Sequence, residues 1–329
     1  MIIRPTALLA GLSVAVTLLV APGAAYAADT TTDLTATEMA AALKTVGAAS
    51  AKAAAQGWNS RSVSTGDEGT DVETTAYDPA RKVYATHRGD AGTTGTDWVV
   101  VSGRGSYSSL TEPVDRSAMA MIGRPKVRWV LQGDTKADAA GTSRQDPLAP
   151  WGVNEPVFSR NAGTKVTHDD GSAEYAAAGR STGFDVTWRV NAAGVLTATT
   201  LTFEDQTLNL SFGYGEQKLT APAAAVSVDY ATYRKALVYL DMPADVKNAA
   251  VQGASAARKA AKGGKVKVAT VRNRVREQAW ESNYKSGVKV VKVKNVTGGA
   301  KVWATNPWTK KTVAYTVKAS GRKVTVRKV

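Results

Sequence analysis

The stretch at residues 183–223 reads GFDVTWRVNAAGVLTATTLTFEDQTLNLSFGYGEQKLTAPA. Apolar and polar residues alternate through it three times, with turn-forming segments at Asn191 to Gly194 and at Glu204 to Gln206. Because successive side chains of a strand point to opposite faces, the alternation predicts an antiparallel three-stranded meander with one apolar face. The residues predicted to share that face are Phe184, Val186, Trp188 and Val190, then Val195, Thr197, Thr199, Leu201 and Phe203, then Leu208, Leu210, Phe212 and Tyr214.

A helix and further strands are predicted upstream of the meander. Thr35 or Thr37 can cap a helix that reaches Gln56 and ends at Gly57. Its apolar positions follow the four-and-three spacing of one helical face: Met39, Leu43 and Val46. Between the helix and the meander, the segments ETTAYDPARKVYATHRG, DWVVVSGRGSYSSL and KVRWVLQ carry strand signals.

The N-terminus predicts export. Arg4 precedes an apolar run from Ala7 to Val20, which is too short to span a membrane and ends at Pro22. Ala25-Tyr26-Ala27 fits the small-x-small cleavage rule, so residues 1–27 are expected to be a signal peptide, removed before Ala28. The chain has no cysteine. Disulfides, thiolate metal sites, a cysteine nucleophile and a lipobox lipid anchor are therefore excluded.

The charge divides the chain into two units. Residues 228–329 contain 23 Lys/Arg and five Asp/Glu, a net charge of +18, whereas the rest contains 19 basic and 23 acidic residues, a net charge of −4. Such asymmetry indicates two units with different partners. The predicted organisation is a signal peptide at 1–27, a first domain at 28–227 and a basic C-terminal domain at 228–329.

The basic segment is predicted to be a small α+β domain. The segment VKVATVRNRVREQAWESNYKSG places Val268, Val271, Val275 and Ala279 at helical spacing, and Gly287 is the expected terminator. Three or four strands follow in VKVVKVKNV, AKVWATN, KTVAYTVK and KVTVRKV, with valine on one face and Lys/Arg on the other. The helix is expected to cover the valine face. The residues predicted to bind a polyanion are Lys289, Lys292, Lys294, Lys318, Lys323 and Arg327.

Catalytic patterns are weak. His87 and His168 are the only histidines, and neither has a second ligand at metal-binding spacing. No G-x-S-x-G supports a serine nucleophile, and the S-x-x-K match at 282–285 lacks its S-D-N and K-T-G partners. We therefore expect no enzymatic activity, no cofactor and no metal.

The apolar face of the sheet has two interpretations. Its tryptophans can fill an ordinary core, or they can line a groove for an apolar ligand where too few helices cover the sheet. The residues predicted to line such a groove are Trp98, Trp129, Trp188, Leu201, Phe203, Leu210 and Phe212.

Residues 28–225 resemble the LolA-like superfamily of envelope lipoprotein and lipid carriers, in particular the actinobacterial LppX/LprG type. The resemblance rests on a helix from Leu34 to Gln56, a K-x-x-W-V element from Lys126 to Val130, and the meander ending in L-T-A-P at Leu219 to Pro222. It implies a strongly curved antiparallel half-barrel with helices across its concave face, which holds acyl chains. Ala28 stands where lipoprotein members carry the lipobox cysteine, and the basic domain is an addition. RseB-like regulatory relatives also pair a half-barrel with a C-terminal domain.

Two functions follow for an exported envelope protein. The first is a carrier or sensor of a lipid, acylated or other apolar ligand, with the basic domain attached to anionic wall polymer or a membrane surface. The alternative is an RseB-like interaction module that acts through envelope proteins or polyanions without a small ligand. Export disfavours nucleic acid as the partner.

Overall fold

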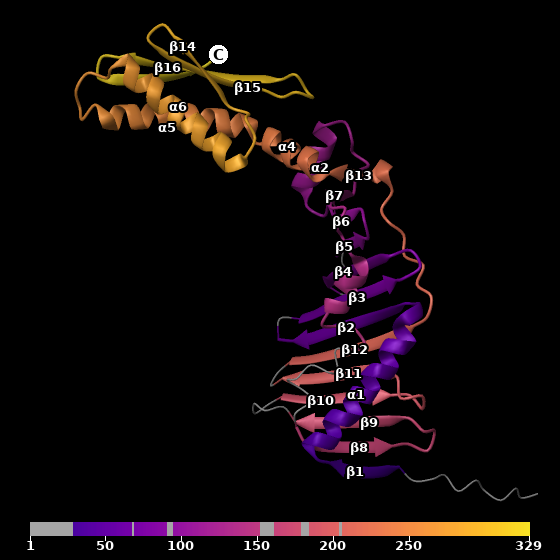
Figure 1. Cartoon of the computed structure of the whole chain (residues 1–329). Coiled ribbons are helices and arrows are strands. Elements are labelled where there is room, and N and C mark those ends of the chain that lie inside the picture. The colour runs from indigo at the N-terminus through magenta and orange to yellow at the C-terminus, as the bar shows by residue number, and fades with distance from the viewer. Residues whose placement is uncertain (1–28, 68, 91–94, 152–160, 179–183, 204–205) are drawn as a thin grey trace, which may run out of the picture.

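The structure is a computed structural model, and it describes residues 29–67, 69–90, 95–151, 161–178, 184–203 and 206–329. The predicted signal peptide lies outside the described residues. The described chain forms a 13-stranded sheet and a separate four-stranded sheet, each with its own helices (Figure 1). The predicted α+β class, with a large curved sheet that stays open and a smaller antiparallel sheet, is confirmed.

The meander is present as predicted. Its strands are β10 (Phe184–Val190), β11 (Leu196–Phe203) and β12 (Gln206–Tyr214), all antiparallel. Trp188 lies opposite Thr199, but the register shifts between Arg189 and Val190. Because of this shift, Leu196 is buried at the start of β11, where the alternation predicted Val195.

Ten further strands complete the large sheet in the order β1-β8-β9-β10-β11-β12-β2-β3-β4-β5-β6-β7-β13. All neighbours are antiparallel except β13 and β7, which are parallel. The N-terminal half of the chain joins the meander where β2 pairs with β12, with Trp58 opposite Tyr214. The remaining bounds are β1 (Thr30–Leu34), β2 (Trp58–Gly66), β3 (Gly69–Asp78), β4 (Val83–Asp90), β5 (Thr96–Val101), β6 (Gly105–Ser109), β7 (Trp129–Gly133), β8 (Gly163–Thr167), β9 (Ala173–Ala178) and β13 (Ser227–Asp229).

The predicted helix is α1 (Ala36–Ala53), which continues as the short 3-10 helix η1 (Ala54–Gln56). Thr35 caps it in a capping box with Glu38, which satisfies backbone N–H groups that the first turn leaves free. Its buried side chains pack on the meander in one core: Met39, Leu43 and Val46 contact the cluster of Trp188, Leu196, Leu201 and Leu210. Figure 1 shows α1 lying across these strands. We call the covered side of the large sheet the helix face and the other side the far face.

Two more helices cover the helix face, and a linker covers part of the far face. α3 (Ala139–Gln145) lies over Trp58, whose indole N–H donates to the Ser143 hydroxyl at 3.1 Å. α2 (Pro113–Met121) closes the β7 end. On the far face, the chain between β12 and η3 (Ala224–Val226) places Leu219 and Ala221 on Val83, Val99 and Tyr107.

The basic unit consists of two helices on one face of the small sheet. Its elements are α5 (Met242–Ala260), α6 (Val268–Ser286), β14 (Lys292–Val296), β15 (Gly299–Thr305), β16 (Thr312–Ser320) and β17 (Lys323–Lys328). The predicted helix is α6, with Val271, Val275 and Ala279 buried and Gly287 left-handed at its end. The alanine face of α5 is buried against α6. Gly253 permits this approach, since a Cβ there would lie 2.8 Å from Val275 Cα.

The two units meet at α4 (Tyr230–Leu240). The predicted boundary at residues 227–228 falls inside β13, and α4 packs on α2, where Tyr233 donates to Asp115 Oδ1 at 2.7 Å. The β15–β16 turn returns to the same place, because the Trp308 ring meets Tyr239 edge-on at 5.6 Å between centroids. The first sheet and the basic unit are therefore joined at two points of the chain.

Candidate functional site

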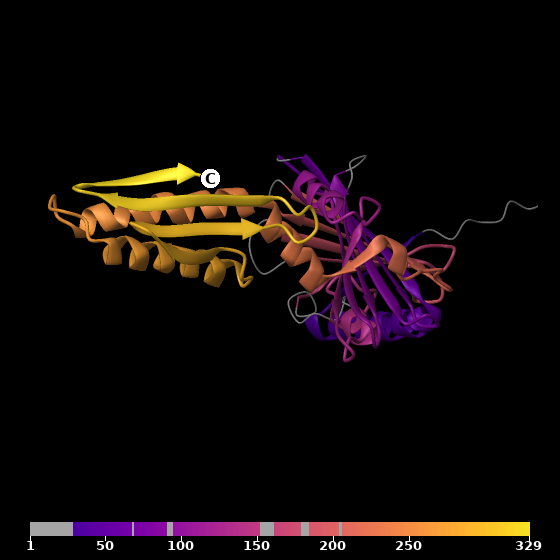
Figure 2. The same cartoon turned by 90° about the horizontal axis from the view of Figure 1, so that it is seen from above.

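The small sheet has one covered face and one open face. Figure 2 shows α5 and α6 along one side of the strands. The valines and alanines of alternate positions, such as Val302 and Val317, are buried against these helices. The positions between them form the open side, which we call the lysine face: Lys292, Lys294, Lys301, Trp303, Lys318, Lys323 and Arg327.

The positive charge of the lysine face is not compensated within the described residues. From Ser282 to Val329 the sequence has twelve Lys/Arg and no Asp/Glu. The ion pairs of the basic unit lie on α6, where Arg274 binds Glu277 at 2.6 Å and Lys285 binds Glu281 at 2.7 Å. Among the described residues, no ion pair involves a side chain of the lysine face. The face is therefore free to bind anions.

Like charges are neighbours on this face. Lys294 lies directly opposite Lys301 on β15, and the same row continues through Thr316 to Arg327. Like charges placed opposite each other destabilise a sheet by roughly 0.2–1 kcal/mol. Trp303 lies in the adjoining row, opposite Lys292, and the Lys294 ammonium lies 5.7 Å from its ring centroid. The arrangement costs stability in the free protein, and an anionic partner would offset that cost.

The structure brings together five of the six residues that the sequence predicted for polyanion binding: Lys292, Lys294, Lys318, Lys323 and Arg327. Lys289 lies before β14, in a groove beside α6. The prediction missed Lys301 and Trp303. The alternation in AKVWATN places both on the polar side of that strand, so the same period-two rule could have found them.

The predicted groove residues fall into three groups. Trp188 is 1% exposed and lies with Leu201 and Leu210 in the core under α1, with Phe212 packed against them. Side chains of α1 thus occupy the space in which the sequence placed an apolar ligand.

Trp98 and Phe203 lie on the same helix face but are 36% and 41% exposed. Trp129 lies on the far face, because it shares its face of β7 with Leu131, whose register partner is Tyr107. There it lines a groove of about 490 Å³ with an apolar floor that includes Ala76, Ala85 and Val99. Groove binding by the predicted residues stays a prediction.

Between the α1 core and α3, the helix face is polar. Ser60 and Thr75 are register partners, and both hydroxyls are buried without a hydrogen-bond partner. Nearby, the Tyr84 hydroxyl donates to Asp146 Oδ2 at 2.9 Å. Burial away from water raises the pKa of the Asp146 carboxyl and that of the Tyr84 hydroxyl, and it is the largest cause in both cases. This strip is lined by small hydroxyl side chains, which do not suit an acyl chain.

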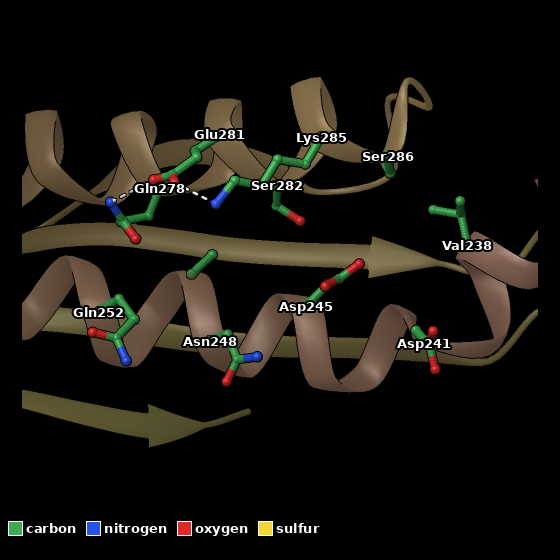
Figure 3. Close-up of a pocket in the computed structure, with 11 residues that line it drawn as sticks. Val238, Asp241, Asp245, Asn248, Gln252, Gln278, Glu281, Ser282, Lys285 and Ser286 are labelled. Carbon is green, nitrogen blue, oxygen red and sulfur yellow. Dashed lines mark hydrogen bonds and ion pairs between the residues drawn. The ribbon is translucent and has the colours of Figure 1, made fainter. Parts of the chain in front are cut away.

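A polar cleft of about 440 Å³ lies between α5 and α6 (Figure 3). Asp245, Asn248 and Gln252 of α5 line it from one side and Gln278, Ser282 and Lys285 of α6 from the other. Burial raises the pKa of Asp245, and the carboxylate of Asp241 raises it further. Lys285 does not offset this effect, because it pairs with Glu281.

The raised pKa of Asp245 makes stability depend on pH. A carboxyl group whose pKa is higher in the folded state than in the unfolded state stabilises the fold at low pH. For Asp245 this contribution is lost as the pH rises from 3.8, the ordinary pKa of the group, through its raised pKa in the folded state. We expect Asp245→Asn to raise the melting temperature at pH 7 and to leave it almost unchanged below pH 4. Thermal unfolding of both proteins at the two pH values measures this; a variant that is less stable at pH 7 contradicts it.

The two histidines bind carboxylates. His87 Nδ1 lies 2.6 Å from Asp97 Oδ1, and His168 Nδ1 lies 3.0 Å from Asp29 Oδ2. Within the described part of the chain, no three or more His, Asp or Glu side chains group in a way that could hold a metal ion. The helices in that part of the chain include none that combines the length and apolar character of a membrane span.

Comparison with known proteins gives structural neighbours alone. No protein-family model matches the chain, and no curated protein matches it. LprF from Mycobacterium bovis is similar at 12% identity and a TM-score of 0.32, over 58% of this chain and 98% of that one. An uncharacterised conserved protein from Thermus thermophilus is similar at 12% identity and a TM-score of 0.27, over 55% of this chain and 95% of that one.

The MucA/MucB complex of Pseudomonas aeruginosa is similar at 10% identity and a TM-score of 0.27, over 56% of this chain and 61% of that one. At such identities the likeness concerns the fold alone.

Proposed function

We propose that this chain is an exported, non-enzymatic envelope protein whose basic unit binds anionic groups of the envelope through the lysine face. The observation that carries the proposal is the open face of the small sheet. It presents six cationic side chains, and none of them forms an ion pair among the described residues. Its partner chemistry is phosphate or carboxylate, borne by a wall polymer or by lipid headgroups. The predicted signal peptide accounts for the location.

The spacing of the cations suits a repeating anion. Neighbouring strands lie about 4.8 Å apart, and alternate residues of one strand about 7 Å apart, so the lysine face offers a two-dimensional array of charges. Each cation near an anionic surface contributes about 1 kcal/mol. Six such contributions reach about 6 kcal/mol, which corresponds to a dissociation constant on the order of 10⁻⁵ to 10⁻⁴ M. Such binding is reversible and depends on salt.

A second candidate function is binding of an apolar ligand by the large sheet. One observation favours it: the groove of about 490 Å³ on the far face, lined by Trp129 and Leu219 over small apolar residues. In this case the basic unit holds the protein at the envelope while the far-face groove carries the ligand. Extraction of the purified mature chain followed by mass spectrometry tests this function, and a lipid-free protein that ignores fluorescent acyl probes contradicts it.

The proposal on the lysine face predicts strong salt dependence. We expect the mature chain to bind polyphosphate and vesicles that contain phosphatidylglycerol, with log affinity falling linearly with log salt concentration. For about six contacts, raising salt from about 50 to 200 mM should lower the affinity by roughly 10³-fold. Titration by light scattering or fluorescence anisotropy measures the slope. Binding of polyphosphate alone identifies a polymer as the source of the anions, and binding that is absent at low salt or insensitive to salt overturns the proposal.

A further inference from the structure

The outer face of α6 carries two exposed aromatic side chains. Trp280 is 65% exposed and Tyr284 is 73% exposed. They are one helical turn apart, and their rings stack at 5.1 Å between centroids with an interplanar angle of 17°. Most of the apolar area of this pair faces solvent, which is unfavourable unless a partner covers it. The stacking presents the two rings as one unit.

These rings form one wall of a groove of about 680 Å³, and the segment that leads into β14 forms the other wall through Lys289, Val291 and Lys292. We call it the aromatic groove. Asn283 fixes the second wall: its Oδ1 accepts hydrogen bonds from the Val290 and Val291 amides, both at 2.9 Å. The groove is therefore a built feature of the fold.

The charges around the aromatic groove are positive. Lys289 and Lys292 lie on its rim and belong to the stretch of sequence that has no acidic residue. The nearest acidic residue in sequence, Glu281, is paired with Lys285. A partner that matches this surface has an apolar region that contacts the two rings, and next to it anionic groups that bind the two lysines.

We propose that the aromatic groove is a membrane-docking site for the interface of an anionic lipid bilayer. Trp and Tyr rings favour the headgroup level of a bilayer, where the apolar part of the ring is buried and its polar atom stays hydrated. Lysines beside them bind anionic headgroups while their stems lie along apolar surface. Lys292 also belongs to the lysine face, so the two surfaces meet at the edge strand β14.

This inference rests on the proposed function, because the lysine face supplies the long-range attraction to an anionic surface. It goes further by naming a bilayer as the partner. The two surfaces share Lys292, but Trp280 and Tyr284 belong to the aromatic groove and not to the lysine face, so substitutions of these two rings test the groove apart. The test protein is the full mature chain with Trp280→Ser and Tyr284→Ser combined. Both side chains are exposed, so the replacement is expected to leave the melting temperature unchanged. Tyr230→Ser is the matched control, because Tyr230 is 48% exposed and lies on α4, outside the residues that line the aromatic groove.

The experiment measures co-sedimentation with vesicles of equal parts phosphatidylcholine and phosphatidylglycerol, and anisotropy with polyphosphate. We expect the double variant to lose about tenfold or more in vesicle affinity, while its polyphosphate binding and all binding by the control stay unchanged. Unchanged vesicle binding by the double variant overturns the inference, as does wild-type binding to polyphosphate without binding to vesicles; both results leave the proposed function intact. A wild-type protein that binds neither overturns both.

Discussion

Replacing Lys294 and Lys301 together by Glu is expected to lower the affinity for polyphosphate by roughly 10²–10³-fold at about 0.1 M salt. Each replacement removes an attraction of about 1 kcal/mol and adds a repulsion of similar size, so two replacements change the binding free energy by about 4 kcal/mol. The two residues are register partners in the middle of the lysine face. Anisotropy of labelled polyphosphate measures the change.

The matched control for this variant is the pair Lys247→Glu and Lys259→Glu on α5. It changes the net charge equally, but both side chains are exposed on the helix that covers the other face of the small sheet. We expect the control to lose less than about tenfold, because exposed charges more than a Debye length of about 10 Å away are largely screened. An equal loss in both variants shows that net charge, and not the lysine face, determines binding.

Trp188→Ala is expected to destabilise the large sheet by about 3–5 kcal/mol. The side chain is 1% exposed and packs with Leu201 and Leu210 under α1, so its removal leaves a cavity that the surrounding core cannot fill. Urea unfolding followed by far-ultraviolet circular dichroism measures the loss. Trp98→Ala is the control, because its ring is 36% exposed and meets Tyr84 edge-on at 5.9 Å, a contact worth about 0.5–1.5 kcal/mol.

The Trp188→Ala variant also distinguishes two roles of Trp188, packing in the core and lining a ligand-binding groove. If Trp188→Ala stays within about 1 kcal/mol of the wild type but loses a bound lipid, Trp188 lines a ligand site and the packed core is not its main role. We expect the opposite result. Met39, Leu43 and Val46 of α1 pack in the same core as Trp188, so the protein's own side chains fill the space beside this ring.

The local elements were predictable because their causes lie within a few residues. The cap at Thr35 depends on Glu38 three positions later, and the meander depends on alternation within each strand. The burial of Leu196 in place of Val195 was not predictable, because the register shift at Arg189 and Val190 is set by how two strands pair. The role of α4 was also missed, since the charge pattern assigned it to the basic unit whereas its contacts with α2 are tertiary.

From the sequence one could derive which side chains share a face along most of the meander, where α1 begins and ends, and that residues 228–329 carry the whole net positive charge. Which faces are covered depends on how distant segments pack together. α1 lies over Trp188, Trp129 faces the other side of the sheet, and the lysine face is open because α5 and α6 both lie behind it. Periodicity and charge are local properties of the sequence, whereas the covering of a sheet face depends on contacts between segments far apart in the chain, such as the pairing of β2 with β12.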